Sequence, residues 1–515
     1  MHFNLTVGNL IEPISGRYWN PPETSRQVDA RIHHYQKLGF SAGDRAFLHL
    51  GNCLEFFADL LAVWRLGGCV IPIDNRLTLF EVQNLAQAAT PRLSIIDDHT
   101  HSCITEYMST LGVTIRHTLD SNAALDHSCD QLNPLNAIRL DDEAFILFTS
   151  GSTGDPKGVV HTHRSLRARW MSLHQSLGTL DFQRSLCMLP THFGHGLICN
   201  CLFPWLSGND LYILPPFRPD LIMNIGSILD EHQITFMSSV PSMWRVALKV
   251  AKPPNQQTLQ RIHCGSAPLS GYLWEEIQAW SGTTAVCNSY GITETGSWVA
   301  GLADKHVTPE DGLIGEGWGS VIKVLKTNDT SVLEETDLIC QPGETGYVWL
   351  NTPALMKTYF QRDDLTNQVV HNGWFMTGDI GLLDDRHRLY LKGRERDEIN
   401  KGGIKIYPAD IDTVIEQFAQ TVDVASFAYD EALYGQDVGV GVVLKDQSQS
   451  TIRDLYGWVK SRLAEHKIPT RWYLMESIPR TSRGKINRAA VMEYCSQQTP
   501  LNLQDILRDS SQRPE

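Results

Sequence analysis

The chain has 515 residues, of which 42% are hydrophobic and 20% are charged, and its formal net charge is -14. This length exceeds what a single hydrophobic core holds, so we expect two or more domains of a globular protein. The acidic balance excludes a general affinity for nucleic acid or for an anionic membrane surface, because both need a basic protein surface. No apolar run reaches the roughly 18 residues of a membrane span. Eleven cysteines without a Cys-x2-Cys pair, and no hydrophobic signal at the start, favour free thiols and a cytoplasmic location.

Extended and helical patterns alternate over the first hundred residues. The sequence predicts strands at 46–50, 69–73 and 93–97, and helices at 30–38, 52–66 and 77–89. This alternation is typical of β-α-β units and of a parallel, doubly wound sheet. Binding sites of such sheets lie beyond the carboxyl ends of the strands.

A stretch rich in glycine and hydroxyl groups follows the next apolar run, Ala144 to Leu147. The eleven residues from Phe148 to Gly158 contain three glycines, four hydroxyl side chains and one lysine. Close backbone N–H groups, hydroxyl donors and a cation together suit a polyphosphate, although a flexible surface turn has a similar composition. The spacing is not that of a P-loop, because Lys157 is followed by Gly158 rather than by a hydroxyl. The candidate ligands of a nucleotide here are Thr149, Ser150, Gly151, Ser152, Thr153, Gly154 and Lys157.

Two histidines, His192 and His195, stand three residues apart after a strand expected at 186–190. Such a pair can bind a metal or relay a proton, and it can equally set the shape of a substrate wall. A later strand, expected from Ile262, ends in small residues against which a flat ring can lie, although a simple β-α turn has the same pattern. Those small residues are Gly265, Ser266 and Ala267.

The octapeptide Asn288 to Thr295 combines an aromatic ring, a glycine and a Thr-Glu pair. It offers a stacking surface for adenine, a hydroxyl for phosphate and a carboxylate for Mg2+, whereas a lone glutamate would be a solvated charge. The candidate residues are Asn288, Ser289, Tyr290, Gly291, Thr293 and Glu294.

Three later features complete the pattern. Asp379 lies among glycines at a tight turn, where a carboxylate can accept from both hydroxyls of a ribose. Residues 393–398 form a charged segment after an expected strand, and Lys485 lies on a glycine turn near the end of the chain. Between them we expect helices at 409–418 and 451–466 and strands at 424–429 and 438–444. These carboxyl-terminal elements predict a compact α+β domain.

Together these motifs resemble the adenylate-forming superfamily, which contains acyl- and aryl-CoA synthetases, nonribosomal adenylation domains and luciferases. Five motifs occur in the family's order along nearly the whole chain. The resemblance implies an α/β fold: a large N-terminal domain of doubly wound sheets with a small β-subdomain at 1–393, a hinge at 394–397 pivoting at Arg396, and a small mobile α+β domain at 398–515.

The resemblance also implies residue roles. The catalytic residues would be Lys485, Glu294 and Lys157, with Glu294 as the metal ligand, and Asp379 and Arg394 would contact the ribose or phosphate. The segment around Phe193 would line the acyl pocket. It has no carboxylate to pair with an ammonium group, so an α-amino acid is a less expected substrate. The expected pocket residues are His192, Phe193, His195, Ser239, Cys264 and Gly265.

The implied activity is ATP- and Mg2+-dependent conversion of a small carboxylic acid to an acyl-adenylate, followed by transfer to a thiol. Coenzyme A is the first choice of thiol, because the chain ends soon after Lys485 without an appended carrier domain. The alternatives are a stand-alone enzyme that loads the phosphopantetheine of an acyl carrier protein, and a nucleotide-binding sensor without turnover.

Overall fold

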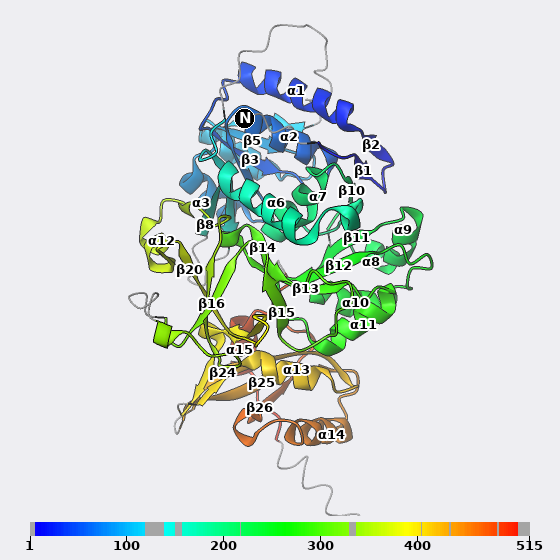
Figure 1. Ribbon diagram of the computed structural model, residues 1–515, viewed down its shortest axis with the longest axis vertical. Coiled ribbons are helices and arrows are strands. Elements are labelled where there is room, and N and C mark those ends of the chain that lie inside the picture. The colour runs from blue at the N-terminus through cyan, green and yellow to red at the C-terminus, as the bar shows by residue number, and fades with distance from the viewer. Residues whose placement is uncertain are drawn as a thin grey trace, which may run out of the picture.

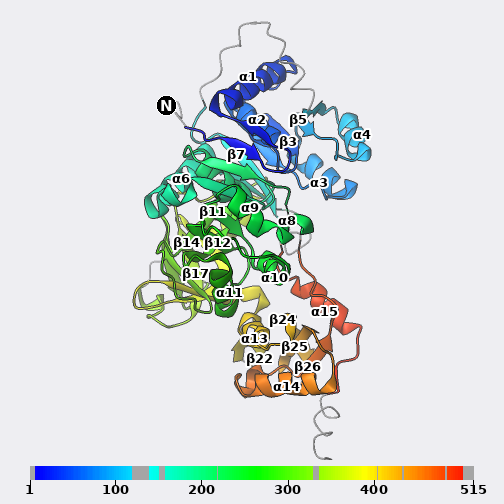
Figure 2. The same ribbon diagram turned by 90° about the vertical axis from the view of Figure 1, so that its right-hand side faces the viewer.

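The computed structural model describes residues 6–118, 138–149, 157–216, 218–328, 336–402, 404–431, 434–481 and 484–502. Within these residues the strands form three sheets. Figures 1 and 2 show the elements from β22 onward as a separate lobe below the rest of the chain. The α/β class and the division into a larger and a smaller lobe predicted from the sequence are confirmed.

The first sheet contains the expected amino-terminal parallel strands. Its order is β18 (Thr358–Tyr359), β8 (Lys157–Thr162), β7 (Glu143–Thr149), β4 (Cys69–Pro72), β3 (Arg45–His49), β5 (Leu93–Ile96) and β6 (Thr114–His117). The β4-β3-β5-β6 part is parallel, and β7 is parallel to β4, whereas β8 pairs antiparallel with both β7 and β18. The connecting helices are α2 (Leu54–Arg65), α3 (Leu79–Ala89) and α4 (Ser102–Thr110).

The second sheet joins a parallel half to an antiparallel half. The parallel half is β1 (Leu10–Glu12), β10 (Asp210–Ile213), β9 (Arg184–Cys187), β11 (Phe236–Ser239), β12 (Arg261–Gly265) and β13 (Val286–Ile292), with β2 (Arg17–Trp19) antiparallel at its edge. The antiparallel half is β14 (Ser297–Gly301), β15 (Leu313–Gly317), β21 (Leu389–Arg394), β20 (Trp374–Leu383), β17 (Gly346–Asn351) and β16 (Val321–Leu325), and β19 (Val370–His371) pairs with β20.

Helices pack on these two sheets. They are α1 (Pro21–Lys37), α6 (His163–Leu177), the π-helix η2 (His195–Leu202), α7 (Phe203–Trp205), α8 (Pro219–Met223), α9 (Ile225–Glu231), α10 (Pro241–Val250), α11 (Gly271–Ser281) and α12 (Asp363–Val369). Helix α1 begins well before the helix predicted at 30–38. Its N-terminus is fixed by Asn20, whose side chain accepts from the backbone N–H of Glu23, and by prolines in its first turn.

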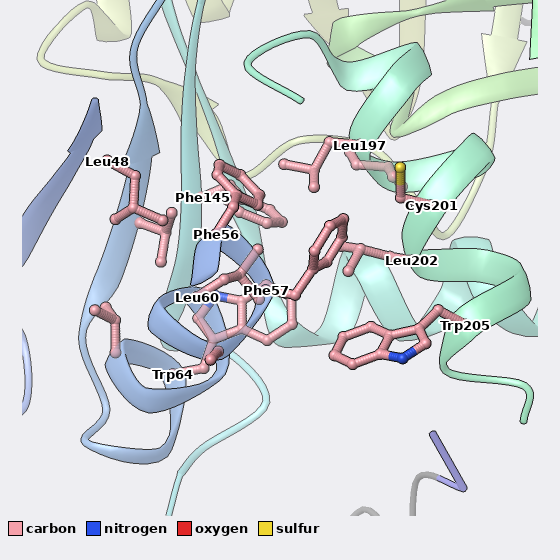
Figure 3. Close-up of a cluster of buried hydrophobic side chains, with 14 of the residues drawn as sticks. Leu48, Phe56, Phe57, Leu60, Trp64, Phe145, Leu197, Cys201, Leu202 and Trp205 are labelled. Carbon is pink, nitrogen blue, oxygen red and sulfur yellow. The ribbon is translucent and has the colours of Figure 1, made fainter. Parts of the chain in front are cut away.

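One hydrophobic core joins the two sheets (Figure 3). Phe57 on α2 points toward the helical segment that carries Leu202 and Trp205, and the rings of Phe57 and Trp205 lie 5.3 Å apart. Phe56 lies beside Phe145 of β7. Because this core is continuous, the end of β7 and the start of η2 are held at fixed positions relative to each other. Both border the candidate site.

The small lobe contains the third sheet and three helices. The strands are β23 (Ile404–Ile406), β22 (Ile399–Lys401), β25 (Gly435–Leu444), β24 (Thr421–Glu431) and β26 (Arg471–Leu474), and the helices are α13 (Pro408–Glu416), α14 (Gln449–Lys460) and α15 (Arg488–Ser496). Helix α14 ends at Lys460, six residues before the predicted end, and residues 465–467 form a separate 3-10 turn.

Candidate active site

The flanks of the glycine-rich stretch form a β-hairpin. Thr149 at the end of β7 pairs with Lys157 at the start of β8, and the Thr149 hydroxyl lies 3.4 Å from the Lys157 carbonyl oxygen. The predicted ligands Ser150, Gly151, Ser152, Thr153 and Gly154 lie outside the described residues. The strand predicted before this stretch is confirmed as β7.

The turn that carries Glu294 is the 3-10 segment η3 (Thr293–Thr295), and three elements hold its backbone. Nε2–H of His161 donates to the Thr293 carbonyl at 2.7 Å, and the Met356 N–H donates to the Glu294 carbonyl at 2.7 Å. The guanidinium of Arg169 donates to the Thr295 carbonyl at 2.9 Å. Three successive carbonyls are therefore fixed, so the position of the Glu294 backbone is determined by β8, α6 and the segment before β18.

Arg169 is fully buried on α6, and its guanidinium forms no ion pair with a carboxylate of the described residues. Its other donors reach the Trp318 carbonyl at 2.9 Å and the Thr352 hydroxyl at 3.3 Å. Burial lowers the pKa of Arg169 to about 10, so the side chain stays charged at neutral pH. The backbone just after the turn has positive φ at Gly296 and at Ser297 (70° and 72°). Positive φ is costly for serine, and the guanidinium contacts stabilise the adjoining backbone.

Tyr359 contacts two of the three charged residues predicted for catalysis. Its hydroxyl donates to Oε1 of Glu294 at 2.7 Å, and Nζ of Lys157 lies 5.6 Å from the centre of its ring. Burial and the Glu294 carboxylate raise the pKa of Tyr359. Lys157 and Glu294, which are distant in sequence, thus lie on either side of one aromatic residue. The sequence analysis did not find Tyr359, because a tyrosine beside a threonine has no local signature of a site.

The residues predicted for the ribose also lie together. The Tyr290 hydroxyl donates to Oδ2 of Asp379 at 2.5 Å, and Nε of Arg394 lies 2.9 Å from Oδ1 of Asp379. Asp379 and Arg394 are partners in the β20–β21 register. Burial, followed by the charge of Asp379, raises the pKa of Tyr290, whereas the Asp379 charge is the largest cause of the raised pKa of Arg394.

His195, the first residue of η2, reaches the facing sheet with both ring nitrogens. Nδ1 lies 2.8 Å from the hydroxyl of Ser266, and Nε2 lies 2.6 Å from the hydroxyl of Ser238. Burial, with a smaller contribution from the Lys485 charge, lowers the pKa of His195 to about 3, so the ring is neutral at pH 7. Ser266 adopts a positive φ of 69°, a backbone strain that accompanies this contact. Ser238 is a contact that the sequence analysis missed.

Aromatic rings surround His195. The ring of Phe193 lies 5.8 Å from that of His195, and the ring of Trp298 lies 5.6 Å from it on another side. Both are buried. A Cβ on Gly265 would lie 3.5 Å from His195 and 2.6 Å from the Ser289 carbonyl oxygen, so only glycine leaves room at the end of β12.

Other predicted residues take different positions. The Ser239 hydroxyl donates to the His263 carbonyl and accepts from Trp244, and Cys264 packs in the same cluster as Trp244. By the alternation of β11, Ser239 faces away from Ser238, and Cys264 on β12 is the register partner of Ser239. The Asn288 amide donates to the Leu313 carbonyl, a Cβ on Gly291 would lie 2.0 Å from the Ser297 carbonyl oxygen, and Ala267 is half-buried after Ser266.

The turn containing His192 lies beside the Glu294 turn. His192 Nε2 is 3.3 Å from Oδ2 of Asp74, and a Cβ on Gly194 would lie 4.0 Å from the Thr293 methyl group. The amide of Asn52 accepts from the Thr191 N–H and so fixes the start of this turn. The predicted substrate wall and the predicted nucleotide motif are therefore neighbours.

The small lobe reaches the same region through Lys485. Gly484 is so close to Ser242 that an added Cβ would lie 2.6 Å from its hydroxyl, and the Lys485 charge acts on His195. Arg245 on α10 and Glu416 on α13 form an ion pair of 2.5 Å between the lobes. Arg396 in the segment between the lobes is largely exposed.

Glu294 is a suitable oxygen ligand for Mg2+, which typically binds one or two carboxylates together with phosphate oxygens. Within the described part of the chain, no cluster of three or more His, Cys, Asp or Glu side chains is placed to hold a metal by itself. The donors therefore fit an ion that arrives with a triphosphate. In the same part of the chain no helix is long and apolar enough to cross a membrane.

Comparison with known proteins identifies the family. The model of the AMP-binding enzyme family matches residues 16–360, and that of the AMP-binding enzyme C-terminal domain matches residues 410–485. The chain belongs to the AMP-binding enzymes. It is accordingly an ATP-dependent ligase that activates a carboxylic acid and transfers it to a thiol, like the acyl-CoA synthetases, and the resemblance inferred from the five motifs is confirmed.

Several relatives cover nearly the whole of this AMP-binding enzyme. The long-chain-fatty-acid–CoA ligase FadD13 of Mycobacterium tuberculosis is 28% identical over 90% of both chains. The 2-succinylbenzoate–CoA ligase of Bacillus licheniformis is 30% identical over 88% of this chain and 90% of its own. The fold also matches ATP-bound MatB from Rhodopseudomonas palustris, with a TM-score of 0.83, 23% identity and coverage of 96% and 97% of the two chains.

Proposed function

We propose that Lys157, Glu294 and Lys485 carry out acid activation in this enzyme. The observation that carries the proposal is the meeting of Lys157 and Glu294 at Tyr359, from separate parts of the chain. A carboxylate must attack the α-phosphate of ATP, which brings one anion to another. Positive groups at the triphosphate lower this repulsion and stabilise the charge that builds on the leaving pyrophosphate.

Each residue has a distinct task in this scheme. Glu294 would hold Mg2+ when the ion is bound, and the ion would supply charge neutralisation. Lys157 contacts the outer phosphates beside the glycine-rich stretch, and Asp379 with Arg394 binds the ribose. Lys485 approaches the α-phosphate from the small lobe. The remaining residues predicted from the sequence to bind the nucleotide are those from Thr149 to Gly154, at 265–267 and in the octapeptide 288–295.

We also propose a domain rotation between the two half-reactions. The units are residues 1–393 and 398–515, with the hinge at 394–397 and its pivot at Arg396. After the acyl-adenylate forms, Lys485 leaves and the segment at Lys401 takes its place at the thiol entrance. The exposed side chain of Arg396 leaves the pivot sterically free to move.

The acid is proposed to be small and uncharged beyond its carboxylate. His195 is neutral and bonds at both nitrogens, and Phe193 and Trp298 pack around it, so this wall supplies apolar and hydrogen-bonding surface without a cation. Coenzyme A is the proposed thiol. The relatives named above are CoA ligases, which supports this choice over the phosphopantetheine of an acyl carrier protein.

A panel of acids with ATP, Mg2+ and one of the two thiols tests the proposal. We expect AMP and a CoA thioester, seen by mass spectrometry, with short aliphatic or aromatic monocarboxylic acids, and less product with long-chain or dicarboxylic acids. If the thioester forms on a phosphopantetheinylated carrier protein but not on CoA, the carrier protein and not CoA is the thiol acceptor. AMP formation with dicarboxylic acids alone would contradict the proposed pocket.

A further inference from the structure

Tyr359 lies between two opposite charges that have no contact with each other. Lys157 Nζ is 5.6 Å from the centre of the tyrosine ring, and the hydroxyl of the same ring bonds Glu294. Among the described residues, Lys157 and Glu294 form no ion pair with each other or with any other residue. Oppositely charged side chains that approach the same ring attract each other, and the Tyr359 hydroxyl gives the Glu294 carboxylate a different partner.

The tyrosine is itself held firmly. Its backbone pairs with Val159 on β8, two residues beyond Lys157, and its N–H donates to the Thr366 hydroxyl at 2.9 Å. The side chain is only 4% exposed and packs with Val159, Met356 and Phe375. A ring fixed in this way cannot follow Glu294 if the carboxylate moves.

The hydrogen bond also selects one oxygen of the carboxylate. The tyrosine hydroxyl bonds Oε1, and in the described part of the chain Oε2 accepts no hydrogen bond. Because the backbone of Glu294 is fixed by Met356 and by the neighbouring contacts of the turn, a bond to Oε1 restricts the torsions of its side chain. Oε2 is then directed by the protein rather than by the ligand.

We propose that Tyr359 is a positioning residue for the adenylation step: it orients Glu294 toward the metal–triphosphate and keeps Glu294 from pairing with Lys157. The proposal rests on the roles proposed above for those two residues. It explains why a buried phenol is placed against a carboxylate. Without the hydroxyl, Glu294 is free to turn to Lys157, and ATP must then break an ion pair before it binds.

The first test is Tyr359→Phe, which removes one oxygen and keeps the ring. Hydrogen bonds to charged groups are worth enough for about a tenfold to hundredfold effect. We expect the rate of acid-dependent ATP–pyrophosphate exchange to fall by about that factor, and the dissociation constant for ATP measured by calorimetry to rise, with the KM for the acid unchanged. Tyr35→Phe is the matched control, because the Tyr35 hydroxyl also bonds a buried carboxylate, Asp59, at 2.6 Å, but far from the site.

The second test asks whether the effect passes through Glu294. In a Glu294→Ala background, Tyr359→Phe should cause no further change in exchange rate or in ATP affinity. If Tyr359→Phe lowers the exchange rate or the ATP affinity as much in the Glu294→Ala background as in the wild-type enzyme, the proposal is overturned. An effect of Tyr359→Phe alone below twofold would overturn it as well. Wild-type enzyme without any acid-dependent exchange would instead overturn the proposed function, so the two failures are distinguishable.

Discussion

The ion pair between Arg245 and Glu416 is predicted to hold the two lobes in the arrangement that forms the adenylate. The two side chains are 2.5 Å apart, and 20% and 16% of their surfaces are exposed. Removing one partner of a well-buried pair costs about 3–5 kcal/mol, and with this partial exposure we expect about 2–3 kcal/mol for Arg245→Met. That change weakens the docking of the small lobe by about 30- to 150-fold.

The two half-reactions should respond differently. Single-turnover adenylate formation needs Lys485 near His195, so it should slow in Arg245→Met. Thioester formation from supplied acyl-adenylate needs the other arrangement, so it should be retained or faster. Lys467→Met is the control, because Lys467 pairs with Asp410 on the same helix α13 but entirely within the small lobe. The reasoning would be refuted if Arg245→Met slowed both half-reactions equally, or if Lys467→Met changed the two rates in the same way as Arg245→Met.

Further predictions concern the lysine, the ribose site and acid stability. Lys485→Ala should abolish adenylate formation yet spare thioester formation from supplied acyl-adenylate, and stopped-flow assays of each half-reaction would reveal equal losses if the division is wrong. Asp379→Asn should raise the ATP dissociation constant by about tenfold or more, because a charged acceptor for ribose hydroxyls is lost, and unchanged calorimetric affinity would exclude that role. Five buried histidines have lowered pKa values because burial disfavours their charged form: about 4 for His49, His161 and His163, about 3 for His195, and well below the usual range for His263. As the pH falls, the unfolded chain therefore binds protons at these histidines before the folded chain does. Unfolding free energy should therefore fall as pH drops from about 6.5 toward 4, by about 9 kcal/mol in total between pH 7 and 5 before other groups contribute. In urea titrations at both pH values His49→Phe should remove about a fifth of that loss, and a loss as large as that of the wild-type enzyme would contradict the reasoning.

The sequence predicted the elements whose signals are local. Apolar runs identified β7 and β12, and helix α2 was found from its apolar spacing. The errors concern where helices begin and end. Helix α1 starts at an asparagine cap and prolines that precede the apolar pattern, and α14 ends within a stretch whose sequence pattern is still helical.

The candidate site was predictable only in part, for a physical reason. Lys157, Glu294, Asp379 and Lys485 stand in motifs, so each could be named from its neighbours in sequence. Contacts that arise from tertiary packing have no such signal: Tyr359, Arg169, His161 and Ser238 act on residues distant in the chain. The contact of Ser238 with His195 shows the same limit, because one residue along a strand reverses the face that a side chain presents, and the sequence does not tell which serine meets the histidine.

The most direct test of the account is ATP–pyrophosphate exchange by the wild-type enzyme, measured with and without each acid of the panel. If positive groups from both lobes activate a carboxylic acid, the exchange requires an acid and Mg2+. The exchange is then lost in Lys157→Ala and in Lys485→Ala. Exchange or ATP consumption that is the same with every acid and with none would contradict it.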